Sequence, residues 1–429
     1  MKARRWVAAA MLLSGLVACR PPEYTITAEG VAAQVEELRA GAGRATVAAL
    51  AFRRLGLATF GGDSDFEQVF TVTARRAGEV SVILDGVKVP AERVAASLSS
   101  EYIRWTDQDS ISVVRVGPER DPMNAWLIWR GAAGKILFLV DAQHVDRFND
   151  VARRMAEPVT GLEVVDGHDM VAVLSSATPR AFRVEGSAHS EVREMANVVG
   201  LLPGKRPNEM IVFSASRDHV SGTSAILELA RYYARRDRPE RTLVFVLYAE
   251  RTSAPALFDV SGPPENYGPP DDFGALHFSL SVDPTHIIAL LHVDRIGEPA
   301  DYREAMEAGT KGGNERSLAA ATWVTGYDRS TLLELMQAAR GDSLQPAFGP
   351  DPYPWFNLFE LLSNAPMAER GVVAHAVGTS PVEETGTWFP DVNAPELLDP
   401  AHMAGVIRAL TAGIRPVVEG EATPIRLDR

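Results

Sequence analysis

Cysteine is almost absent from this sequence, with Cys19 the only one among 429 residues. A single cysteine excludes an intramolecular disulfide. Basic residues are too few to balance the acidic ones: 43 Lys and Arg stand against 56 Asp and Glu, and the formal net charge is −13. A chain this acidic repels phosphate backbones, which argues against nucleic acid as a partner.

Long apolar runs are missing after the N-terminus. No later stretch reaches the roughly 18 apolar residues that a membrane-spanning helix needs, so the body of the protein is expected to be soluble. Hydrophobic residues make up 46% and charged residues 23%, ordinary values for a globular protein of two or three domains. This composition excludes a disordered tail protein, a collagen-like fibre and a polytopic membrane protein.

The N-terminus has the pattern of a secretory signal. Three basic residues precede an apolar segment over residues 6–18, which is shorter than the roughly 20 residues that span a bilayer. The segment closes with Leu16-Val17-Ala18-Cys19, which resembles the lipobox of bacterial lipoproteins. The resemblance implies a signal peptide over residues 1–18 and a lipid on the sulfur of Cys19. The alternative is an ordinary signal peptide with an unrelated cysteine.

A lipid at Cys19 would make residues 19–25 a lipidated tether and anchor the protein to a bacterial membrane, facing the periplasm. Arg20 follows in place of an aspartate, which favours the outer membrane.

The first half of the mature chain predicts two helices and then a β-rich region. Val31, Val35 and Leu38 have helical spacing, and a second helix is expected to end at Gly56. Asp85-Gly86 between alternating apolar residues predicts a hairpin. Strands are then expected at Ile111–Val116, Ala125–Trp129 and Lys135–Val140, and a helix at Val145–Met155.

After Ala196, short continuous apolar runs alternate with helical patterns. Such runs suit strands buried on both faces, and the alternation predicts an α/β three-layer sandwich with a mixed, mostly parallel central sheet. Ligands bind such sheets at the carboxyl ends of the strands. Asp399 before Pro400 predicts the start of the last helix. The strands are expected at Met210–Ser214, Thr242–Ala249, Ile287–Val293 and Val372–Val377.

Four segments of this half carry a family resemblance: Asn197–Gly204, Ser221–Ala230, Arg241–Val246 and His292–Gly297. These segments resemble parts of the zinc-dependent aminopeptidase family, which includes bacterial leucyl aminopeptidase, glutamate carboxypeptidase II and the transferrin receptor. In chain order they are similar to the entry strand of that family, the helix after its bridging aspartate, and its next two strands. The resemblance implies a peptidase-like N-terminal segment (26–74), an inserted small β-rich domain similar to a protease-associated domain (75–190), an aminopeptidase-like α/β domain (191–418) and a tail (419–429).

In that family, His and carboxylate ligands hold two zinc ions, and a glutamate base activates a bridging water. By resemblance, Glu250 matches the base and Asp294 matches an aspartate ligand of the second metal. Asp218 can match the bridging aspartate or, because an intervening loop is deleted, the aspartate of the His-x-Asp motif. Three ligand positions have lost their ligands and hold Ser216, Arg251 and Phe389.

These losses favour a metal-free pseudopeptidase that acts in binding or scaffolding with a protein or peptide partner. Serine is a poor zinc ligand, phenylalanine is none, and Arg251 brings a permanent positive charge to where a dication should sit. Arg251 would instead pair with Asp218, Glu250 or Asp294 in a buried ion-pair network.

The alternative is an active zinc aminopeptidase with a rebuilt metal site. His292 precedes Asp294 by two residues on a strand, so both side chains share one face, and His219 adjoins Asp218. Together with Glu250, these four residues could form a mononuclear zinc site.

Overall fold

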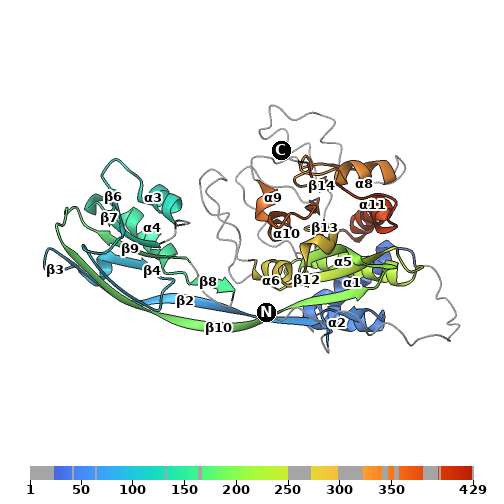
Figure 1. Cartoon of the computed structure of the whole chain (residues 1–429), viewed down its shortest axis with the longest axis horizontal. Helices are drawn as coiled ribbons and strands as arrows, with labels where there is room; N and C mark the ends of the chain where they lie inside the picture. Colours follow the sequence, from blue (N-terminus) through green and yellow to red (C-terminus); the bar gives the residue numbers. More distant parts are fainter. Residues whose placement is uncertain are drawn as a thin grey trace.

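Two lobes joined by two long strands, β2 (Glu67–Leu84) and β10 (Phe182–Leu202), make up the computed structural model (Figure 1). The structure describes residues 24–40, 43–62, 65–130, 132, 134–162, 167–249, 272–297, 322–340, 346–351, 357–379, 395 and 398–427. Four of the predicted functional residues lie outside this part of the chain: Cys19, Glu250, Arg251 and Phe389.

The larger lobe is built on a mixed sheet. Strands β11, β12, β13 and β16 are parallel to one another, whereas β10 pairs antiparallel with β12 and β14 pairs antiparallel with β16. The order is β15-β14-β16-β13-β11-β12-β10-β2-β3. The strands that form the larger lobe are β11 (Arg206–Ser216), β12 (Arg241–Tyr248), β13 (Ile287–Val293), β14 (Thr322–Val324), β15 (Phe348–Pro350) and β16 (Ala374–Gly378).

Helices cover both faces of this sheet, because alternate residues of its buried strands point to opposite sides. Phe213, Phe245 and Leu291 face a core formed with α1 (Ala28–Arg39), α2 (Arg44–Arg54), α5 (Val220–Ala234), α8 (Leu332–Arg340) and α11 (Pro400–Val418). Val212, Val244 and Leu290 face α6 (Phe273–Ser281) and α10 (Ala365–Glu369), beside the short α9 (Leu358–Leu361). The predicted α/β fold with a mixed central sheet is confirmed.

The smaller lobe has a separate sheet in the order β4-β9-β7-β6. One face packs on two helices, and the other packs on the outer parts of β2 and β10 together with β5. The expected boundaries after residues 74 and 190 fall inside β2 and β10, so continuous strands join the lobes (Figure 1). The bounds are β4 (Val94–Ser97), β5 (Tyr102–Thr106), β6 (Ser112–Val116), β7 (Gly134–Val140), β9 (His168–Leu174), α3 (Pro122–Trp129) and α4 (Val145–Met155).

The remaining elements are short. Strand β8 (Val159–Leu162) pairs with β2, and β1 (Ala58–Thr59) pairs with β10. The predicted hairpin is confirmed: Asp85 (φ 45°) and Gly86 (φ 83°) connect β2 to β3 (Val87–Lys88) in the left-handed conformation that such two-residue turns require. The 3-10 helices are η1 (Ala91–Arg93), η2 (Ala142–His144) and η5 (Pro284–His286).

One predicted strand is wrong. Residues Ala125–Trp129 belong to helix α3, which begins at Pro122. The Asp121 carboxylate accepts hydrogen bonds from the backbone N–H groups of Met123 (2.7 Å) and Asn124 (3.3 Å) and so caps the helix. The short apolar run looked like a strand because periodicity alone does not separate a buried strand from a buried helix.

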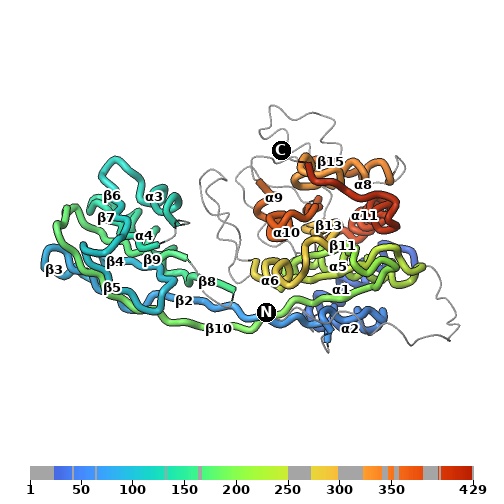
Figure 2. Tube along the Cα trace, in the orientation of Figure 1, coloured from blue at the N-terminus to red at the C-terminus, as the bar shows by residue number. Residues whose placement is uncertain are grey.

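The first and last helices lie side by side although they are distant in the sequence (Figure 2). Helix α1 packs on α11 and α5, and the Arg408 guanidinium of α11 donates to the backbone carbonyl of Ile26 at 3.1 Å. Among the described helices, none is both long and apolar enough to cross a membrane.

Candidate functional site

The candidate site lies where the parallel strands β11, β12 and β13 end. Ser216 pairs with Tyr248, and Ser214 pairs with His292, so these strands reach the same edge in register. Helix α5 follows closely: a side chain at Gly222 would come within 2.5 Å of the carbonyl oxygen of Val293. The loops after β11 and β13 are thereby brought together.

His219 and Asp294 form the central contact of this edge. Nδ1 of His219 donates to Oδ1 of Asp294 at 2.5 Å. Only 12% of the His219 side chain and 1% of the Asp294 side chain are exposed. His219 stands at the N-cap of α5, and Asp294 directly follows β13.

Arg295 places a permanent cation beside the same carboxylate. Its Nε atom lies 4.0 Å from Oδ2 of Asp294, and its side chain is 7% exposed. Its φ of 49° is left-handed, which is uncommon for a residue other than glycine. The bend is fixed at the next residues, because the backbone N–H of Thr379 donates to the carbonyl of Arg295 and that of Ile296 donates to the hydroxyl of Ser221.

These two neighbours keep Asp294 ionised. Burial by itself raises the pKa of this carboxyl, but the charges of His219 and Arg295 outweigh burial and hold the pKa well below its usual range. The carboxylate is therefore a buried anion with its counter-charges already in place.

The other predicted residues that the structure describes lie around this pair, and the charge of His292 also acts on Asp294. The Ser216 side chain is buried, and its Oγ accepts the backbone N–H of Asp218 at 3.3 Å. Asp218 is half-buried, and Arg44 of α2 donates to its backbone carbonyl at 3.2 Å. His292 is buried, and its Nδ1 lies 3.2 Å from Oγ of Ser214.

The described residues do not fit a zinc ion. Within the described ranges, no three His, Cys, Asp or Glu side chains are grouped closely enough to hold a metal. Asp294, one of the two carboxylates that the resemblance assigns to metal binding, uses Oδ1 for His219 and has a guanidinium near Oδ2. A dication at Asp294 would have to compete with both the imidazole of His219 and the guanidinium of Arg295.

Sequence reasoning missed Arg295. It expected Arg251 to supply the counter-charge, and Arg251 lies outside the described residues. The sequence does show that Arg295 is adjacent to Asp294. It does not show that the backbone of Arg295 is left-handed, because arginine has no preference for that conformation.

The fold is similar to that of zinc aminopeptidases. An aminopeptidase from Aneurinibacillus sp. strain AM-1 shows 14% identity and a TM-score of 0.47, with 91% of this chain and 94% of that chain covered. BSAP, a zinc aminopeptidase from Bacillus subtilis, shows 13% identity and a TM-score of 0.48, with 94% and 98% covered.

A peptidase M28 precursor from Shewanella amazonensis shows 14% identity and a TM-score of 0.45, with 93% of this chain and 95% of that chain covered. No protein-family model and no curated protein sequence matches the chain. At these identities the likeness concerns the fold and says nothing about the reaction.

Proposed function

We propose that this chain is a lipid-anchored pseudopeptidase, which has an aminopeptidase-like fold, performs no hydrolysis, and acts by binding or scaffolding a protein or peptide partner. The observation that carries the proposal is the buried contact between His219 and Asp294 at 2.5 Å, with Arg295 beside it. An imidazole and a permanently charged guanidinium occupy the surroundings of the carboxylate that a metal would need.

The chemistry of zinc supports this proposal. A catalytic zinc site needs three protein ligands and an open position for water. Here Ser216 stands at a position where the resemblance implies a histidine, and the ring nitrogen of His219 is directed at a carboxylate. A permanent guanidinium within 4.0 Å of Asp294 also disfavours a dication at this place.

A peptidase assay tests the proposal. We expect no hydrolysis of leucine p-nitroanilide above the uncatalysed background, with or without added zinc. The matched variant Glu250→Gln removes the base that the resemblance implies and should behave as the unmodified protein does. Zinc-dependent hydrolysis that is lost in Glu250→Gln would overturn the proposal in favour of an active zinc aminopeptidase with a rebuilt site.

The proposal places the protein in the bacterial cell envelope, anchored through Cys19 and facing the periplasm, with the outer membrane favoured by Arg20. The acidic surplus of the chain, with its formal charge of −13, supports a protein or peptide partner over nucleic acid.

The anchor can be tested by Cys19→Ser. Because the sulfur is the site of lipid attachment, this variant should stay unprocessed or leave the membrane fraction. Ser14→Ala, which leaves the lipobox-like residues intact, is the control and should be processed normally. Membrane fractionation and the mass of the product are the measurements. A Cys19→Ser protein that still fractionates with membranes at the mature mass contradicts the lipid anchor.

A further inference from the structure

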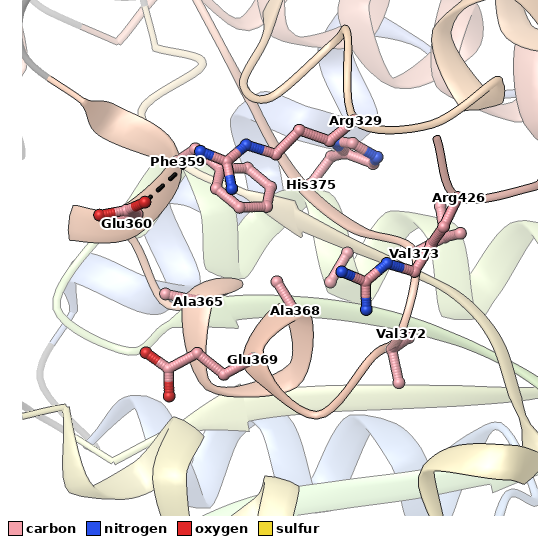
Figure 3. Close-up of a pocket in the computed structure, with 11 residues that line it drawn as sticks. Arg329, Phe359, Glu360, Ala365, Ala368, Glu369, Val372, Val373, His375 and Arg426 are labelled. Carbon is pink, nitrogen blue, oxygen red and sulfur yellow. Dashed lines mark hydrogen bonds and ion pairs between the residues drawn. The ribbon is translucent and has the colours of Figure 1, made fainter. Parts of the chain in front are cut away.

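A second candidate site lies at the opposite end of the sheet. A cavity of about 350 Å³ is bounded by helices α9 and α10, the segment that leads into β16, the loop after β14 and the C-terminal segment (Figure 3). It adjoins the amino end of β16, whereas Asp294 follows the carboxyl end of the parallel neighbour β13. The cavity is therefore separate from the aminopeptidase-like site.

The floor of this cavity is apolar. Ala365, Ala368, Val372 and Val373 line it, and each is buried in the fold. His375 also lines the floor, but both of its ring nitrogens are engaged, by the Ser330 hydroxyl and by the Thr325 carbonyl, each at 2.7 Å. The floor thus offers a surface for an apolar group.

The rim carries charges of both signs. Arg329 and Glu360 pair with each other at 3.4 Å, and the Arg329 guanidinium stacks 4.5 Å from the ring centre of Phe359. The side chains of the other two charged residues, Arg426 and Glu369, form no hydrogen bond or ion pair with any described residue. Figure 3 shows the carboxylates of Glu360 and Glu369 on one side of the cavity and the Arg426 guanidinium on the other.

The backbone that carries Arg426 is held in place. Arg426 forms a β-bridge with Ser330, and the N–H of Leu427 donates to the carbonyl of Arg329 at 2.9 Å. Its guanidinium lies over Gly371, where an added side-chain carbon would come within 3.2 Å of Nη1. Gly371 also has a φ of 90°, so both its conformation and its missing side chain suit this position. The arginine is thus presented to the cavity by a fixed strand-like segment.

We propose that this cavity binds a small zwitterion with an apolar side chain, namely a free apolar amino acid or a short apolar peptide. The carboxylate of the ligand pairs with Arg426, because guanidinium groups bind carboxylates through two parallel hydrogen bonds. The ammonium group pairs with Glu369, and the side chain lies on Ala368 and Val372. The volume lies at the small end of the range for ligand pockets, which suits a ligand of this size.

Calorimetric titration of the intact protein with leucine and with Leu-Leu tests this proposal. We expect saturable binding of at least one, and the tighter binder identifies the source as free amino acid or peptide. Arg426→Gln and Glu369→Gln should each weaken binding by about tenfold, the effect of losing a hydrogen bond to a charged group. The exposed residues Arg183 and Glu334 provide the controls Arg183→Gln and Glu334→Gln, which should bind as the unmodified protein does.

Ligand analogues separate the two charges. N-acetyl-leucine lacks the ammonium group, so Glu369→Gln should not change its affinity, whereas Arg426→Gln should still weaken it. Leucinamide lacks the carboxylate and should show the reverse pattern. The proposal is overturned if neither leucine nor Leu-Leu binds at millimolar concentration, or if both bind Arg426→Gln and Glu369→Gln as tightly as the unmodified protein. Because the cavity is remote from Asp294, ligand bound at the aminopeptidase-like site would not respond to Arg426→Gln or Glu369→Gln, so these variants distinguish the two sites.

Discussion

Replacing Asp294 with asparagine is expected to lower the free energy of unfolding by about 3–5 kcal/mol at neutral pH, the range for removing one partner of a buried ion pair. Asparagine keeps the volume of the side chain, so the loss reports on charge and not on a cavity. The His219 ring and the Arg295 guanidinium, 12% and 7% exposed, would lose the carboxylate that they face. Denaturant unfolding of both proteins measures the difference.

The effect of this substitution should depend on pH in a defined direction. The pKa of Asp294 is lowered in the folded protein, so its contribution to stability is fully present above the pKa of about 3.9 in the unfolded chain and is lost as the pH falls through the folded-state pKa. The contribution of the Asp294 carboxylate to this difference should therefore persist in mild acid and be lost only in strong acid.

Asp107→Asn is the matched control for Asp294→Asn, because Asp107 is exposed and its substitution should change stability by no more than about 0.5 kcal/mol. If Asp294 were instead a metal ligand crowded by other carboxylates, neutralising it in metal-free protein would leave stability unchanged or raise it. That result would contradict the ion-pair interpretation.

Mild acid should destabilise the protein through His375. Burial lowers the pKa of this imidazole to about 4, although its hydrogen bond to Thr325 opposes the shift. The folded state therefore holds His375 neutral, while the unfolded chain takes up a proton near pH 6.5. The contribution of His375 to the free energy of unfolding is fully present above pH 6.5. Between pH 6.5 and pH 4 it falls by about 1.4 kcal/mol for each pH unit.

The contribution of His375 can be isolated with His375→Gln. Glutamine has a donor and an acceptor for Thr325 and Ser330 but does not titrate, so the variant should lose less stability between pH 6.5 and pH 5 than the unmodified protein, by about 2 kcal/mol. His189→Gln, at an exposed position, is the control. Equal pH dependence in His375→Gln and the unmodified protein would show that His375 does not titrate in this way.

The elements with strong local signals could be predicted from the sequence. Strand β13 (Ile287–Val293) and helix α4 (Val145–Met155) have the predicted bounds, because a nearly continuous apolar run and a clear amphipathic pattern leave little choice. The Asp399 cap of α11 was also predicted and accepts the N–H groups of Ala401 and His402. Residues Ala125–Trp129 failed because their apolar run fits either a strand or a helix.

The candidate sites were less predictable, because their residues meet through tertiary structure. His219 and Asp294 were both named as candidates, yet nothing in the sequence shows that one would donate to the other. The cavity that we propose as a zwitterion site has no sequence motif. Arg329, Glu369 and Arg426 come from three separate segments of the chain. They meet only because β16 and the C-terminal segment both lie beside the loop after β14.

The zinc content of the purified mature protein, measured by elemental analysis after dialysis, tests the central claim most directly. The claim is that an ion pair stands where the family resemblance implies a metal site. Because His219 and Arg295 already supply the counter-charges of Asp294, we expect far less than one equivalent of zinc to remain. One or two equivalents that survive dialysis would contradict the account.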